Sequence, residues 1–209
     1  MTLRDVGKRG EGILQSWASE EDASLTKTDD DRWGWDFLLE FPIQRTSVGA
    51  EPDKEEEVYR CLIQVKSTSS SDRSCQVKMS NWRRLVETPL PAFFLVLRFD
   101  SVRACREAFL VHVGEDEISK VLRKARELGV AGEGDRLHKH TLVLQWCDEQ
   151  RLPGTTGQAL LDGIRRLIGP SPADYSKRKL GLRERVGYDA ANAQVTTLNR
   201  PGFSGGWIT

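Results

Sequence analysis

The sequence predicts an α/β protein with a mixed α+β sheet. Its core should contain a helix, three strands, a helix and a strand, with additional C-terminal strands and helices after it. Two observations lead to this prediction: apolar residues between 6 and 19 recur with a helical period, and three extended segments follow before the next helical segment. With 209 residues and 38% hydrophobic content, the chain is long enough to bury one sizeable core.

The first predicted helix covers residues 6–19. Its apolar side recurs at the spacing of an amphipathic helix and comprises Val6, Gly10, Ile13, Leu14 and Trp17. Glu11 lies at the flank of this stripe, next to Leu14. We therefore expect a helix that buries one side.

Three strands should follow this helix. Residues 23–27 are a weak strand candidate, and residues 33–41 indicate a largely buried strand interrupted by the charge of Asp36. Residues 42–57, with Pro, Gly and a run of acids, are expected to form an exposed loop. The strand pattern returns over residues 58–68.

A short helix and a strand complete the predicted core. We expect Ser80 to be the N-cap of the helix, which should end before Pro89. Residues 91–99 contain the longest apolar run of the chain and predict a strand.

Beyond the core, the pattern predicts alternating strands and helices, namely a strand at 106–113, a helix at 114–129, a strand at 139–146, a helix at 155–168 and a further basic helix after 171. We divide the chain into a core over residues 1–113, an αβα continuation packed on it over 114–170, and a basic extension with a Gly-rich tail over 171–209.

Composition narrows the possible functions. Lys and Arg number 31, as do Asp and Glu, so attraction to a nucleic acid must come from a local patch. The four cysteines form no CxxC pair, which argues against a zinc knuckle or a disulfide framework. The longest apolar run is far shorter than a membrane span. We expect a soluble cytoplasmic protein without a membrane anchor.

Polar residues near the ends of two predicted strands form the candidate site. Gln64 and Lys66 are two positions apart on one strand and therefore point to the same side. If the second and third strands pair as a hairpin, Asp36 comes beside Gln64. A carboxylate and an amide carbonyl are hard ligands for Mg²⁺ (or Mn²⁺), and a nearby ammonium suits phosphodiester hydrolysis. The second Gln-Val-Lys, at 76–78, is expected to lie in an exposed edge or loop and is left out of the site.

These residues resemble the PD-(D/E)XK nuclease superfamily over roughly residues 6–99, in the QxK variant of Mrr-like restriction endonucleases. The resemblance implies a restriction-endonuclease-like αβββαβ core, with Asp36 as the first acid, Gln64 in place of the usual second acid and Lys66 as the catalytic lysine. Glu11 matches an auxiliary acid on the first helix. The implied activity is metal-dependent cleavage of DNA in bacterial restriction or anti-phage defence, as a homodimer or a subunit of a larger defence system.

DNA contact is a separate prediction. The basic segment around 177–185 is the best phosphate-binding candidate, because few acids accompany it. The candidate DNA-binding residues are Lys8, Arg9, Arg83, Arg84, Lys177, Arg178, Lys179, Arg183 and Arg185.

Two alternatives stay open. Asp36 and Lys66 could form a structural salt bridge, with Glu11 a solvated helix residue. The replacement of an acid by Gln64 also fits a catalytically inactive module that binds nucleic acid or assembles a defence complex.

Overall fold

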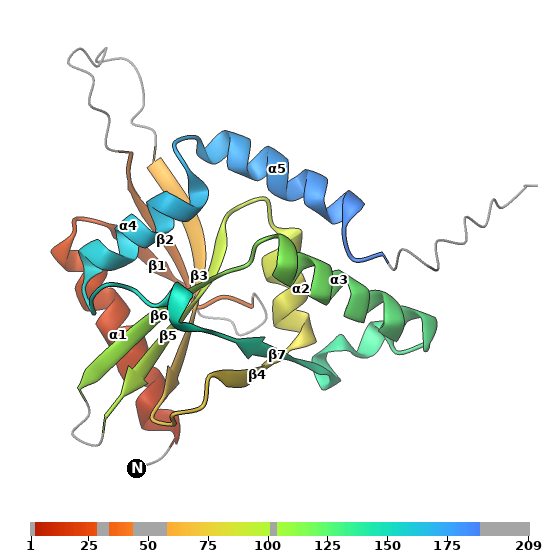
Figure 1. Cartoon of the computed structure of the whole chain (residues 1–209), viewed down its shortest axis with the longest axis horizontal. Helices are drawn as coiled ribbons and strands as arrows, with labels where there is room; N and C mark the ends of the chain where they lie inside the picture. Colours follow the sequence, from red (N-terminus) through yellow and green to blue (C-terminus); the bar gives the residue numbers. More distant parts are fainter. Residues whose placement is uncertain (1–2, 29–33, 44–57, 101–103, 189–209) are drawn as a thin grey trace, which may run out of the picture.

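A computed structural model describes residues 3–28, 34–43, 58–100 and 104–188. Its centre is a five-stranded mixed sheet with the strand order β1-β2-β3-β5-β6 (Figure 1). Strands β3 and β5 are parallel, and the other neighbours are antiparallel. The strands are β1 (Ser24–Lys27), β2 (Phe37–Pro42), β3 (Val58–Thr68), β5 (Ala92–Phe99) and β6 (Cys105–His112).

Each face of the sheet has its own apolar core. Helices α1 (Leu3–Glu20) and α4 (Gly157–Ile168) pack on one face, which we call the α1 face. Helices α2 (Met79–Glu87) and α3 (Glu115–Val130) pack on the other, the α2 face, together with a small sheet of β4 (Ser74–Lys78) and β7 (Thr141–Gln145). Short 3₁₀ helices η2 (Gly134–Lys139) and η3 (Asp148–Gln150) flank β7.

Helix α5 (Pro172–Arg185) contacts both cores. Its Tyr175 belongs to the core of the α1 face, and its Leu182 packs against that of the α2 face. In Figure 1 it runs from α4 towards α2 and α3. Helix α5 is therefore part of the same folded unit.

The sheet positions the candidate site through the alternation of β3. Cys61 and Ile63 are buried in the core of the α1 face, whereas Leu62 is buried in that of the α2 face. Because strand side chains alternate, Gln64 and Lys66 point to the α2 face. The loop-and-helix connection from β3 to β5 passes over this face through β4 and α2.

The prediction of an α/β protein with a mixed sheet is confirmed, and β3 covers the predicted residues 58–68. Asp36, predicted inside the second strand, instead lies directly before β2, which begins at Phe37. The strand predicted over residues 33–41 therefore begins later than expected, at Phe37, and ends at Pro42.

Residues 74–78, predicted as an exposed edge or loop, form an edge strand of the two-stranded sheet. They form β4, which pairs with β7, and Val77 is buried. Gln76 and Lys78 are exposed, so the second Gln-Val-Lys lies on the surface. A pairing partner that comes much later in the chain supplies the burial that local sequence does not show.

The predicted N-cap of α2 is also corrected. The cap position is Lys78, without a side-chain hydrogen bond, and Ser80 lies inside the helix. The Met79 amide donates instead to the His140 carbonyl at 2.9 Å. The helix can begin directly after β4 because His140, the residue before β7, supplies an acceptor that a capping side chain otherwise provides.

In the part of the chain that the structure describes, no helix is long and apolar enough to cross a membrane.

Candidate functional site

Asp36 lies where β2 and β3 separate. The β2–β3 ladder ends at the pair Phe37–Ile63, while β3 continues to Thr68. The Asp36 amide donates to the Ile63 carbonyl at 2.9 Å, and its Oδ2 accepts the Val65 amide at 2.6 Å. The Asp36 carboxylate thus accepts the hydrogen bond that a backbone carbonyl would accept if the β2–β3 pairing continued.

Gln64 lies beside Asp36 and is buried. The antiparallel register that pairs Phe37 with Ile63 brings Asp36 opposite Gln64, as the predicted hairpin requires. Gln64 is 4% exposed, and its Oε1 is buried without a hydrogen-bond partner in the described structure. A buried acceptor left unsatisfied costs about 1–3 kcal/mol, so this oxygen is suited to bind a donor, a water or a cation.

Lys66 completes the group on the α2 face. It is half-buried, and within the described residues its ammonium makes no hydrogen bond or ion pair. Burial raises the pKa of the Cys75 thiol, and the positive charge of Lys66 partly offsets this rise, which places Lys66 near β4. The described residues therefore contain no Asp36–Lys66 salt bridge, and that alternative is wrong.

Glu11 lies at the same end of the sheet but contacts a different face. Its neighbour Gly10 packs so closely on β3 that a Cβ there would lie 2.0 Å from Ser67 Oγ. The Glu11 carboxylate pairs with Lys27 Nζ at 2.7 Å. Lys27 is in register with Phe37, whose side chain is in the core of the α1 face. Glu11 is therefore engaged away from Gln64 and Lys66.

The residues present fit a weakly held divalent cation. The described residues contain no group of three His, Cys, Asp or Glu side chains that could hold a metal. A carboxylate at Asp36 and an orphaned amide oxygen at Gln64 are nevertheless hard oxygen donors, and Mg²⁺ commonly keeps several waters with few protein ligands.

The arginines of α2 lie close to the segment that carries Asp36. A Cβ on Gly34, which has φ +79°, would lie 2.9 Å from Asn81 Cα and 3.3 Å from Arg84 Cβ. Arg83 pairs with Glu87 at 2.6 Å, while Arg84 is half-buried beside Gly34. Both arginines line an open groove between α2 and η2 with Ser80, Glu87, Gly134, Asp135, Leu137 and His138.

Helix α5 gives a mixed result for the predicted DNA contacts. Lys179 is 2% exposed, and its Nζ donates to the carbonyls of Leu85 and Leu90. Its prediction as a DNA contact is wrong, because the buried ammonium holds the C-terminal end of α2. Arg183 likewise donates to the Glu87 carbonyl at 2.8 Å.

The other predicted basic residues are closer to the surface. Lys177 is exposed and lies 4.0 Å from Asp174, and Lys8 on α1 is exposed beside the half-buried Arg9. Arg178 and Arg185 line a separate cavity described below. The predicted DNA contacts thus lie on three helices, α1, α2 and α5.

Sequence reasoning did not identify Cys75 as a neighbour of the site, or Ser67 as a contact of α1 on the opposite face. Cys75 lies on β4, which was predicted as an exposed edge or loop, and Ser67 Oγ is buried without a partner in the described structure. The period-two pattern of β3 could have placed Ser67 on the face opposite Lys66. Its close contact with Gly10 could not be read from spacing.

Comparison with known proteins adds no assignment: the chain matches no protein-family model, no curated protein and no solved structure.

Proposed function

We propose that the protein is a Mg²⁺-dependent endonuclease that hydrolyses DNA phosphodiester bonds. The observation that carries the proposal is the convergence of Asp36 and Gln64 where β2 and β3 separate, with Lys66 on the same strand face. Such groups on rigid strands suit a preorganised site. The proposed setting is cytoplasmic bacterial restriction or anti-phage defence, as a homodimer or with a partner subunit.

Each side chain has a distinct role in this proposal. The Asp36 carboxylate accepts the Val65 amide, which fixes its position at the end of the β2–β3 ladder. Gln64 offers a buried oxygen that otherwise lacks a partner. A bound Mg²⁺ would supply polarisation of the phosphate and a water of lowered pKa. Lys66, without an ion pair among the described residues, would stabilise negative charge developing on the phosphate.

The groove beside α2 supports a path for the DNA backbone. Arg84 lies against Gly34, just before Asp36, so a phosphate held by Arg84 would be next to the candidate site. Arg83 is already paired with Glu87, and we expect it to contribute less.

A catalytically inactive nucleic-acid-binding module is the second candidate. Two observations favour it. Gln64 is neutral where an acid is usual, and Glu11, the carboxylate expected to replace that missing charge, is already paired with Lys27. On this alternative, the purified chain binds DNA without cutting it, alone or within a defence complex.

The discriminating experiment measures cutting and binding separately. The wild type and the Asp36→Asn, Lys66→Ala and Arg166→Ala variants are incubated with plasmid and with linear single- and double-stranded DNA, in Mg²⁺, Mn²⁺ or EDTA. We expect cutting that needs metal, is lost in Asp36→Asn and Lys66→Ala, and persists in Arg166→Ala, a control at an exposed residue of α4. Retained DNA binding without cutting in any metal would establish the inactive module instead.

A further inference from the structure

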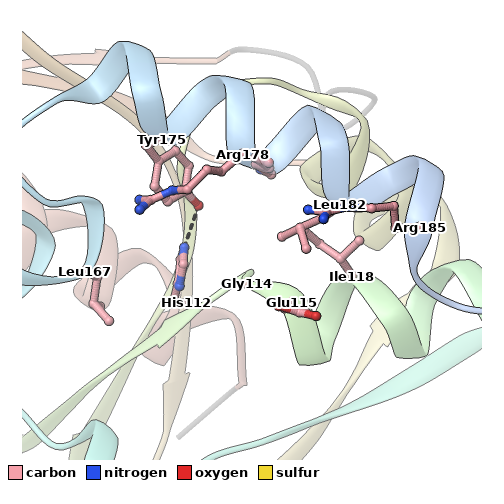
Figure 2. Close-up of a pocket in the computed structure, with 10 residues that line it drawn as sticks. His112, Gly114, Glu115, Ile118, Leu167, Tyr175, Arg178, Leu182 and Arg185 are labelled. Atoms are coloured by element: carbon pink, nitrogen blue, oxygen red, sulfur yellow. Dashed lines mark hydrogen bonds between the residues drawn. The ribbon is translucent and has the colours of Figure 1, made fainter.

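A second cavity, of about 270 Å³, lies between the end of β6, the start of α3 and helix α5 (Figure 2). Its lining joins polar groups from three elements with apolar side chains. The lining residues are His112, Gly114, Glu115, Ile118, Leu167, Tyr175, Arg178, Lys179, Leu182 and Arg185. None of them belongs to the Asp36 site.

Part of the cavity wall is apolar. Ile118 is buried on α3, and Leu167 and Leu182 are half-buried on α4 and α5. The Lys179 ammonium bonds to the Leu85 and Leu90 carbonyls, so this side chain offers the cavity its hydrocarbon stem. A ligand with a flat or hydrocarbon part can therefore be desolvated here.

Two arginines provide positive charge at the cavity. Arg178 donates one hydrogen bond to the Ile168 carbonyl at 3.4 Å, and Arg185 donates one to Gly181 at 3.2 Å. A guanidinium carries five N–H donors, so each retains donors for a ligand. Glu115 contributes the one negative side chain among the lining residues.

The start of α3 adds backbone donors on the opposite wall. Its N-cap, Gly114, has no side-chain cap hydrogen bond, and the helix has 16 residues. The first-turn amides and the helix dipole attract negative charge, which the carboxylates of Glu115, Asp116 and Glu117 in the same turn already supply. Figure 2 shows Gly114 and Glu115 facing the α5 side chains across the cavity.

His112 lies at the end of β6 and contacts Tyr175. The His112 Nε2 and Tyr175 Oη are 2.5 Å apart, and a Cβ on Gly114 would lie 2.9 Å from His112 Nδ1. Burial and the positive charges of Lys179 and Arg178 lower the pKa of His112 to about 4. With Tyr175 donating to Nε2, the neutral ring directs an Nδ1–H donor to the start of α3.

We propose that this cavity binds a small phosphorylated organic molecule of mononucleotide size. Its phosphate lies against the α5 wall of the cavity, at Arg178 and Arg185. Its ring packs against Ile118 and Leu182, and its hydroxyl groups donate to Glu115. The volume of about 270 Å³ is just below the roughly 300–1,000 Å³ of ligand pockets, so the occupant is at most about one nucleotide in size. The proposal is independent of metal binding at Asp36.

The test uses adenosine monophosphate as the probe, with inorganic phosphate and adenosine as separate arms. Calorimetric titration of the full chain should show binding of the monophosphate, weaker binding of phosphate and little binding of adenosine. The double substitution Arg178→Ala and Arg185→Ala should weaken binding of the monophosphate by about tenfold or more, because charged hydrogen bonds to it are lost. Arg166→Ala, at an exposed residue of α4 outside the cavity, should leave it unchanged.

An independent readout comes from the unmodified chain. Nuclear magnetic resonance should show the monophosphate shifting the amide signals of Gly114 and Ile118 and raising the pKa of His112, because an anion stabilises the imidazolium. This readout decides the question even if the double variant does not fold. Absence of binding by the monophosphate and by phosphate at millimolar concentration, or equal binding of adenosine, would overturn the proposal.

Discussion

Lys179 holds helix α5 to α2: its Nζ lies 2.8 Å from the Leu85 carbonyl and 2.7 Å from that of Leu90. Burial, with the nearby charge of Arg183, lowers the pKa of this lysine to about 7. The basic helix that suggested a DNA-binding surface thus uses one of its charges inside the protein. The ammonium satisfies carbonyls near the end of α2 that have no helical partner.

The first prediction concerns the pH dependence of stability. The folded pKa of Lys179 is about 7 and its ordinary value is 10.5, so between these pH values the unfolded chain binds more protons. The free energy of unfolding should therefore be highest with respect to Lys179 above pH 10.5, decrease as the pH falls from 10.5 to 7, and not change further below pH 7. Lys179→Met should flatten this slope in urea unfolding between pH 7 and 10, whereas Lys177→Met should not. An unchanged slope in Lys179→Met would contradict the assignment.

His112 should impose a second pH dependence in acid. Its folded pKa of about 4 lies below the ordinary 6.5, so the native state binds fewer protons than the unfolded chain in this range. Stability from the neutral ring is present above pH 6.5 and decreases as pH falls to 4. His112→Gln should reduce the loss of thermal midpoint between pH 6.5 and 4, and the exposed control His138→Gln should follow the wild type.

Gly10 should be intolerant of a side chain. A Cβ there would lie 2.0 Å from Ser67 Oγ and 3.1 Å from Val65 Cγ1, so α1 must shift or Ser67 must change rotamer. We expect Gly10→Ala to destabilise the protein by about 1–3 kcal/mol, the usual cost of overpacking. Gly12→Ala on the same helix meets nothing within 4 Å and should be neutral or stabilising by denaturant unfolding.

The strands of the core could be predicted from sequence because their pattern is local. β3 alternates between two buried cores and matched its predicted bounds, and the β2–β3 hairpin brought Asp36 beside it as expected. For β4 the sequence left an exposed edge and a loop both open, because the burial of this edge strand depends on β7, which comes much later in the chain. Charge alone also gave no sign that Lys179 is buried.

The candidate site was predictable in composition but not in detail. Residue types and strand spacing identified Asp36, Gln64 and Lys66. The bond from the Val65 amide to Asp36 could not be foreseen, since it depends on where the ladder ends. Nor could spacing show that Glu11 pairs with Lys27 across the α1 face, because that contact is tertiary.

Asp36 should prove functional as well as structural, and two substitutions separate the roles. Asp36→Asn keeps an oxygen that can accept the Val65 amide, so we expect stability within about 1 kcal/mol of wild type and loss of metal-dependent cutting. Asp36→Ala leaves that amide without its acceptor and should cost about 1–3 kcal/mol. Denaturant unfolding and plasmid cutting provide the two measurements. Full cutting by a folded Asp36→Asn protein would remove this carboxylate from the proposed mechanism.

Gln64 determines how tightly a divalent cation can bind. A neutral amide oxygen attracts Mg²⁺ less than a carboxylate does, so Gln64→Glu should increase the metal-dependent rise in thermal midpoint. The new acid is buried beside Asp36, and without metal the two carboxylates repel, so the same variant should be less stable than wild type in EDTA. Gln76→Glu, at the exposed copy of the tripeptide, should change neither quantity and serves as the matched control. If Mg²⁺ raised the midpoints of wild type, Gln64→Glu and Gln76→Glu equally, the cation would bind elsewhere, and Gln64 would not be one of its ligands.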